Sequence, residues 1–132
     1  MLKPPTVDDF ARAAELREAL RRFQRTTDDT TAAAGMTART YQLLLMIKTG
    51  RRGNGRASLR ELEERLQLGK STVTELVLRT ERRGLARREL DRDRPGAISV
   101  RLTSAGERKL AQVTTELGDE RERLIDILSN LR

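Results

Sequence analysis

The order of the segments in the second half of the chain constrains its fold most. Two short helical segments are expected over residues 59–66 and 70–83, joined by a tight turn that ends at Gly69. Two runs of extended character follow, over 85–90 and 97–102, and a Pro-Gly pair marks the turn between them. Helix, tight turn, helix and hairpin, in that order, predict a winged helix-turn-helix. We therefore expect a mainly α fold with one small hairpin.

Capping residues predict where the two short helices begin. Ser58 and Thr72 are each followed three positions later by a glutamate, Glu61 and Glu75, which is the spacing of a capping box. In the second extended run, apolar side chains alternate with polar ones, as in a half-buried strand. The side chains expected to point inward in that strand are Ile98, Val100 and Leu102.

A further helix is expected over about 38–49, with Thr37 as its cap. Gly50 follows it and suits the left-handed position after a helix, and Gly84 ends the 70–83 helix. Between the first of these helices and Ser58, the glycines and arginines of 50–56 predict a flexible basic loop.

Longer helices are expected on either side of this core. The first spans 7–26, and the polar stretch 26–35 is interpreted as a connection. The last spans about 104–130, capped by Thr103 or Ser104, and its leucines are spaced nearly as heptads, which favours a seam with a second helix. We expect one domain over 1–132, with a winged-helix core at 37–103 and dimerisation helices at 7–26 and 104–131.

The charge of the chain is concentrated in its middle third. Lys and Arg number 27 against 20 Asp and Glu, a net charge of +7. Residues 51–101 hold 14 of these bases and 8 of the acids, so their net charge is +6, against +2 before them and −1 after them. A basic centre between nearly neutral ends indicates a polyanionic partner, with double-stranded DNA as the default. No apolar run approaches the length of a membrane span, so we expect a cytoplasmic protein without a membrane partner.

Catalytic chemistry finds little support in the sequence. The chain has no cysteine and no histidine, which excludes disulfides, thiol chemistry, ordinary zinc sites and the commonest general base. Gly69-Lys70-Ser71 looks like the end of a phosphate-binding loop, but position 64, where such a loop needs a glycine, is Glu64. We expect no enzyme, no catalytic residues, no metal and no cofactor.

The 70–83 helix is the expected recognition helix. Its apolar side should pack on the domain through Val73, Leu76, Val77 and Thr80. Short hydroxyl side chains near its start let the backbone approach phosphates and bases, and the hairpin tip adds arginines. The candidate DNA-binding residues are Lys70, Ser71, Thr72, Thr74, Glu75, Arg79 and Arg82 on the helix, and Arg92 and Arg94 on the hairpin.

Several of these residues also have plain structural interpretations. Glu75 is either the partner of a capping box or an acceptor for a cytosine amino group. Arg79 is either a base contact or one half of a surface ion pair. Leu78 either touches a thymine methyl or packs on a neighbour. The arginines of the 50–56 loop suit solubility better than specific contact, although contact with phosphate stays open.

The residues around this helix resemble the MarR family of bacterial winged-helix regulators. Ser71-Thr72-Val73-Thr74, then Leu76-Val77, Arg79 and Gly84-Leu85, are similar to that family's recognition helix. The resemblance extends from about residue 37 to 106. It also rests on Thr37, Tyr41 and Leu44, on Leu62, Leu66 and Leu68, and on Val100-Arg101-Leu102-Thr103 with Gly106.

Two features depart from the family pattern. Pro95 follows Asp93-Arg94 in a hairpin about one residue longer than usual, which leaves the choice between Arg92 and Arg94 as the minor-groove residue open. The 50–56 loop is also longer and more basic than usual for the family.

The resemblance implies a homodimer that binds a palindromic operator and represses transcription. It also implies release of the DNA by a small aromatic effector bound near the junction of the dimer and DNA-binding parts. Tyr41 and Met46 are candidate lining residues, with ordinary core positions as the alternative. The alternative function is a winged-helix module for protein–protein interaction without specific DNA binding.

Overall fold

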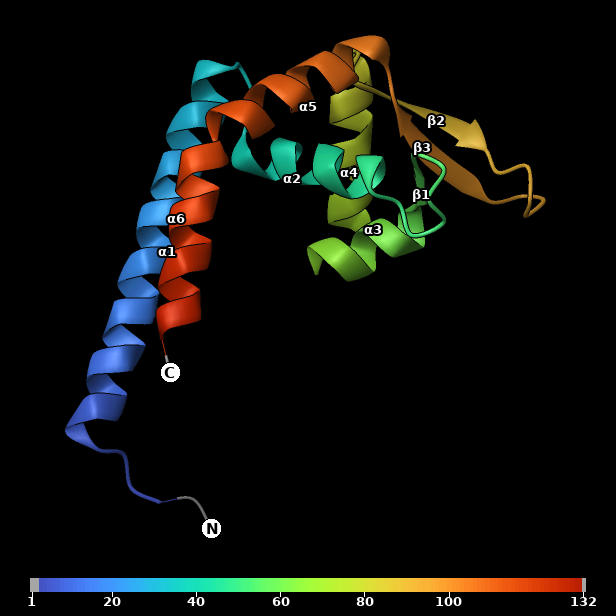
Figure 1. Ribbon diagram of the computed structural model, residues 1–132. Helices are drawn as coiled ribbons and strands as arrows, with labels where there is room; N and C mark the ends of the chain where they lie inside the picture. The colour runs from blue at the N-terminus through green and yellow to red at the C-terminus, as the bar shows by residue number, and fades with distance from the viewer. Residues whose placement is uncertain (1–2, 132) are drawn as a thin grey trace.

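The structure, a computed structural model, describes residues 3–131 (Figure 1). Residues 1, 2 and 132 of the expected domain lie outside this range. The elements are, in chain order, α1 (Val7–Ala33), α2 (Ala38–Lys48), β1 (Arg56–Ser58), α3 (Leu59–Leu66), α4 (Lys70–Arg82), β2 (Ala86–Leu90), β3 (Ile98–Leu102), α5 (Ser104–Glu116) and α6 (Gly118–Asn130). Figure 1 shows α1 and α6 side by side as an arm that projects from the remaining elements, which form the winged helix. The predicted mainly α, winged-helix fold is confirmed.

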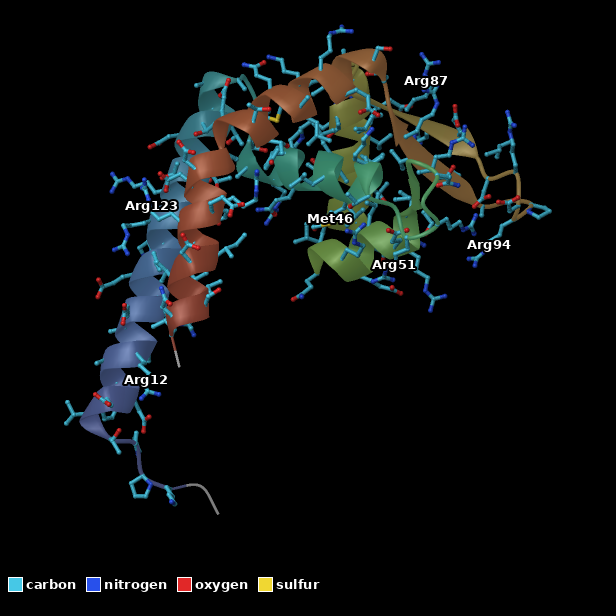
Figure 2. All side chains as sticks on the ribbon, viewed as in Figure 1. Arg12, Met46, Arg51, Arg87, Arg94 and Arg123 are labelled. Carbon is cyan, nitrogen blue, oxygen red and sulfur yellow. The ribbon has the colours of Figure 1, made fainter. Side chains whose placement is uncertain are left out.

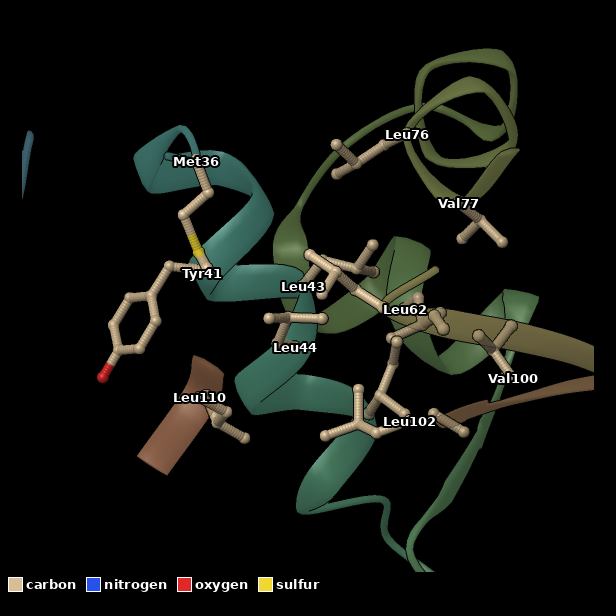
Figure 3. Packing of buried hydrophobic residues seen from close by; sticks show 14 of the residues in the cluster. Met36, Tyr41, Leu43, Leu44, Leu62, Leu76, Val77, Val100, Leu102 and Leu110 are labelled. Atoms are coloured by element: carbon tan, nitrogen blue, oxygen red, sulfur yellow. The ribbon is translucent and has the colours of Figure 1, made fainter. Parts of the chain in front are cut away.

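The winged helix is built around α2, which contacts α1, α3, α4 and α5 and also β1 and β3. Leu43 and Leu44 on α2 are fully buried, as are Leu62 on α3 and Val100 on β3. Figure 3 shows these side chains gathered with others from α4 and α5. A fully buried leucine contributes about 2–5 kcal/mol of stability relative to alanine, so this cluster dominates the packing of the domain.

The sheet has three antiparallel strands in the order β1-β3-β2, so the hairpin acquires a third strand that the sequence did not predict. β1 takes up the end of the segment expected as a flexible loop. Gly50 does not have the left-handed backbone predicted for it. It is required because a Cβ at this position would lie 1.8 Å from the carbonyl oxygen of Arg56. Gly84, with φ of 75°, does end α4 as expected.

The alternation predicted for β3 holds at Val100 and Leu102 and is wrong at Ile98. Ile98 is 37% exposed, because it lies at the far end of the strand, where it pairs only with the exposed Leu90. Ser99 is buried instead, since it pairs with Ser58 on one side and Glu89 on the other. The central position of β3 therefore overrides the simple two-residue pattern.

The first helix is longer than predicted. The stretch 26–35, expected as a connection, continues α1 as far as Ala33. The Thr27 hydroxyl donates to the carbonyl of Phe23 (2.9 Å), and the Thr31 hydroxyl donates to that of Thr27 (2.8 Å). Both threonines are buried, so their polar groups are satisfied inside their own helix and do not end it.

The last helix is two helices. The single helix predicted over 104–130 breaks at Leu117, where φ is −89° and ψ is 3°, and resumes at Gly118. Leu110, Val113 and Leu117 are buried in the winged-helix core, whereas α6 packs on α1. One straight helix could not lie on both surfaces, and Gly118 lowers the helix propensity where the direction changes. Thr103 is the cap of α5, with its hydroxyl accepting from the Gly106 N–H.

Neither predicted capping box forms. Ser58 caps α3 by accepting from the Glu61 N–H at 3.0 Å, but the Glu61 carboxylate turns to Arg51 and Arg65. Thr72 does not cap a helix, because α4 already begins at Lys70. The N-cap of α4 is Gly69, and no side chain caps it.

Candidate nucleic-acid interface

The recognition helix α4 is anchored through one face. Val73, Leu76, Val77 and Thr80 are buried, as predicted, and the Thr80 hydroxyl donates to the Leu76 carbonyl at 2.8 Å. Figure 3 shows Leu76 and Val77 directed toward the core. Because this face is held, the orientation of the opposite face is fixed relative to the rest of the winged helix.

The opposite face of α4 is open to solvent. Of the predicted site residues on this helix, Thr74 is half-buried, and those exposed are Lys70, Ser71, Thr72, Glu75, Arg79 and Arg82. Leu78 is half-buried rather than exposed. No side chain caps the start of the helix, so its first backbone N–H groups and the positive end of its dipole are available to an anion.

Arg79 and Glu75 form an ion pair on this face. Arg79 Nη2 lies 2.9 Å from Glu75 Oε1, one helical turn away, and both side chains are exposed. Of the alternatives that the sequence left open, the surface ion pair of Arg79 is present, and the capping role of Glu75 is not.

The hairpin β2–β3 forms the wing, and its tip holds Arg92 and Arg94, both exposed. The Asp91 N–H donates to the Ala97 carbonyl (2.9 Å) and closes the turn. Asp91 Oδ1 accepts from the Asp93 N–H (2.9 Å), and this bond is the main reason that the pKa of Asp91 lies below its ordinary value. The tip thus has a defined backbone path that presents both arginines, and Pro95 lies within it (Figure 2 labels Arg94).

Most basic side chains of the middle third have carboxylate partners. Within the described residues, ion pairs engage Arg51, Arg52, Arg56, Arg60, Arg65, Arg79, Arg88 and Arg101. Arg83 instead donates to the Gly35 carbonyl at 3.0 Å. The basic side chains of this third for which the structure shows no carboxylate partner are Lys70, Arg82, Arg87, Arg92 and Arg94, together with Arg83.

The uncompensated positive charge therefore gathers on α4, β2 and the wing tip. Four of those residues were predicted as site residues. Arg87, labelled on β2 in Figure 2, was placed only in a charge run by the sequence. The sequence could not separate Arg87 from its neighbour Arg88. The two differ only in the folded structure, where Arg88 forms an ion pair with Glu81.

The two candidate effector residues lie in and against the core. Tyr41 is buried, and its hydroxyl forms a 2.9 Å hydrogen bond with the Thr114 hydroxyl. Met46 is half-buried, and its carbonyl accepts from Arg65. A hollow of about 230 Å³ between α1 and α6 is lined by other residues, Phe23 and Ile127 among them. A role for Tyr41 and Met46 in effector binding stays a prediction.

Residues 3–131 offer no metal site and no membrane span. Acidic side chains in this range form no group of three or more that could hold a metal ion. None of its helices is long and apolar enough to cross a membrane.

Comparison with known proteins shows which family the sequence of this region resembles. Residues 34–94 match the MarR family, a range that runs from the end of α1 to the wing tip. A search of curated proteins found no match to the sequence.

Solved structures share the fold. AbsC, a MarR family transcriptional regulator from Streptomyces coelicolor, matches with a TM-score of 0.80 and 19% identity over 96% of this chain and 84% of AbsC. A mutant MarR from E. coli complexed with operator DNA gives 0.69 and 19%, over 82% and 75% of the two chains. The MepR–DNA complex from S. aureus gives 0.70 and 17%, over 83% and 79%. Together, the match over residues 34–94 and the shared fold confirm the resemblance predicted from the sequence: these residues are similar to the MarR family, and the chain has the fold of solved MarR family regulators.

Proposed function

We propose that this protein is a transcription regulator that binds double-stranded DNA in a sequence-specific manner. The observation that carries the proposal is the location of the uncompensated basic side chains, on the open face of α4, on β2 and at the wing tip. Two of the structures with this fold, MarR and MepR, are complexes with DNA, which supports the same conclusion.

In this proposal α4 lies in the major groove, which is about 12 Å wide and admits one helix. The uncapped helix start, with Lys70, Ser71 and Thr72, approaches phosphates. Arg79 and Thr74 lie further along the helix and reach base edges. Arg82 and Arg87 follow the backbone of the duplex.

The wing supplies a second contact beside the groove. Arg92 and Arg94 extend from a hairpin that is held by backbone hydrogen bonds, and they reach the minor groove or the adjoining phosphates. Each phosphate that a basic side chain neutralises releases counterions, so affinity falls steeply as salt concentration rises.

We also propose that the protein binds as a homodimer through its arm. Large apolar side chains on α1 and α6 are exposed, including Phe10 (64%), Leu20, Ile125 and Leu128. A second copy would remove them from water. Two copies related by a two-fold axis place two α4 helices about one turn of DNA apart, which matches a palindromic operator. Repression is the expected outcome when such an operator overlaps a promoter.

Selection of bound duplexes from a random pool tests binding, sequence preference and palindromy together. With the selected duplex, Arg79→Ala is expected to cost about 1–3 kcal/mol and to relax the preference at one position of each half-site. Lys70→Ala is expected to weaken all duplexes alike and to lower the salt dependence.

Arg108→Ala is the matched control, since it removes one exposed arginine from α5, outside α4 and the wing. Folding of each variant is checked by its thermal unfolding. If random duplex at low salt is not retarded at all, the proposal is wrong, and the alternative of a protein–protein interaction module is favoured.

A further inference from the structure

The segment 50–55, called the basic loop below, has a defined structure. The Gly53 N–H donates to the Gly50 carbonyl (2.9 Å), and Asn54 Oδ1 accepts from the Arg56 N–H (3.1 Å). The Arg51 N–H donates to Glu61 on α3 (3.0 Å), whose side chain is nearly buried. These hydrogen bonds tie the loop to α3 and to β1, although residues 51–54 are exposed, as the sequence predicted.

Arg52 extends from this loop to the wing. Its Nη1 atom lies 3.3 Å from Asp91 Oδ2 and 3.5 Å from Asp93 Oδ2, across about forty positions of sequence. The Asp91 side chain is only 7% exposed and that of Arg52 is 36% exposed, so solvent screens their interaction less than it screens an ordinary surface pair. Arg52 also helps to lower the pKa of Asp91, after the hydrogen bond from the Asp93 backbone.

A second set of ion pairs joins the strands of the wing to β1, further from the tip. Glu89 on β2 accepts from Arg101 on β3 and pairs with Arg56 on β1 at 3.4 Å. The loop and the strand that follows it therefore hold the wing at two levels, near its tip and along its stem.

The ion pairs of Arg52 with Asp91 and Asp93 change the net charge around the wing tip. Residues 91–94 contain two aspartates and two arginines, so the tip by itself has no net charge. Without another cation nearby, Asp91 and Asp93 would repel phosphates and attract Arg92 and Arg94. Arg52 supplies that cation from outside the wing, which leaves the local charge at +1.

We propose that Arg52 is a positioning residue for DNA binding: it holds Asp91 and Asp93 and so leaves Arg92 and Arg94 for the duplex. The inference rests on the proposed function, because it assigns a role within the same interface. It gives the basic loop a purpose other than solubility. Arg52 itself need not touch the DNA.

Arg52→Ala and Arg51→Ala form a matched pair for the first test. Both remove one arginine from the same loop, but Arg51 pairs with Glu64 on α3, at 2.9 Å, and not with the wing. On the selected duplex, Arg52→Ala is expected to bind about tenfold more weakly, whereas Arg51→Ala stays within about threefold of the wild type. Footprinting should show loss of the wing's protection and retention of the protection by α4.

A rescue experiment separates neutralisation of the acids from loss of a DNA contact. Adding Asp93→Asn to Arg52→Ala removes one of the carboxylates that Arg52 neutralises, so the double variant should regain most of the lost affinity. A direct contact between Arg52 and phosphate would not be restored by this change. Asp93→Asn alone is expected to bind at least as tightly as the wild type.

Amide hydrogen exchange of the free protein provides a readout that does not depend on DNA. Exchange over residues 91–97 should accelerate in Arg52→Ala and not in Arg51→Ala. Equal affinities of these two variants, or no rescue by Asp93→Asn, would overturn the inference while leaving DNA binding in place. If the wild type binds no duplex, the proposed function fails and so does this role of Arg52, whereas the exchange data still decide whether the loop holds the wing.

Discussion

On α4, the ion pair between Arg79 and Glu75 holds the guanidinium along the surface that we propose faces DNA. Exposed pairs one helical turn apart contribute only about 0.3–0.5 kcal/mol, so this one adds little to stability. Its effect is on orientation, since Arg79 is the longest side chain in the middle of that face. A held guanidinium presents its paired N–H groups in one direction, which suits the O6 and N7 atoms of guanine.

Glu75→Ala is therefore expected to change base preference more than stability. Its melting temperature should stay close to that of the wild type, while duplex selection should show a weaker preference at the position that Arg79 contacts. Arg79→Lys should also lose this preference, because an ammonium cannot donate in the same bidentate way. Unchanged preference in both variants would show that the pair has no role in recognition.

At the scale of elements, close contacts between backbones decide how α5 meets the sheet. A Cβ on Gly106, in the first turn of α5, would lie 2.0 Å from the carbonyl oxygen of Leu85. This glycine lets the helix begin directly against the end of α4 and the start of β2. A Cβ on Gly118, at the start of α6, would meet nothing closer than 3.7 Å.

Gly106→Ala is accordingly expected to destabilise the protein by about 3 kcal/mol or more, because backbone must move to admit the methyl group. Gly118→Ala is the control within the same helical region and should be neutral or stabilise by up to about 1 kcal/mol through helix propensity. Urea unfolding of the two variants measures the difference. Equal stabilities would mean that α5 and Leu85 are not held as closely as the structure shows.

Across the whole molecule, several carboxylates accept hydrogen bonds that join one element or loop to the next. The pKa values of Glu64, Glu81, Glu89 and Asp91 all lie below their ordinary values, 4.5 for glutamate and 3.8 for aspartate. Hydrogen bonds are the main cause in each, from Arg51 to Glu64, from the Arg88 backbone to Glu81, from Arg101 to Glu89 and from the Asp93 backbone to Asp91. They join the basic loop to α3, β2 to α4 and β3 to β2, and the last one lies within the wing tip.

Because these folded-state pKa values are depressed, the stability that they contribute is complete above the unfolded values and is lost as pH falls through the folded ones. We expect a nearly constant melting temperature from neutral pH down to about 5 and a decline below about 4. Glu81→Gln should flatten part of this decline, and high salt should flatten it further. A melting temperature that is unchanged down to pH 3 would contradict this expectation.

Local sequence patterns were sufficient for α3, α4 and the hairpin of the central winged helix. The spacing of apolar residues placed α3 and α4, Gly84 ended α4, Pro-Gly located the wing turn, and the inner face of α4 was predicted residue by residue. These features depend on residues a few positions apart, so the sequence displays them directly. The candidate DNA-binding residues on α4 and the wing followed from the same local patterns.

Other features depend on which segments meet, and only the tertiary structure decided them. The helix α1 continues through the polar residues near its C-terminus because Thr27 and Thr31 are buried there. The helix breaks at Leu117 because α5 and α6 cover two different surfaces. β1 exists because β3 has a free edge beside it.

The same holds for charge. The sequence determined that the middle third is basic, but not which arginines would be neutralised, since Arg52 and Arg88 find their carboxylates on other elements. An ion pair forms over a few ångströms in space, whatever the separation along the chain. Composition therefore fixed the sum of the charges, and the fold decided where the excess is exposed.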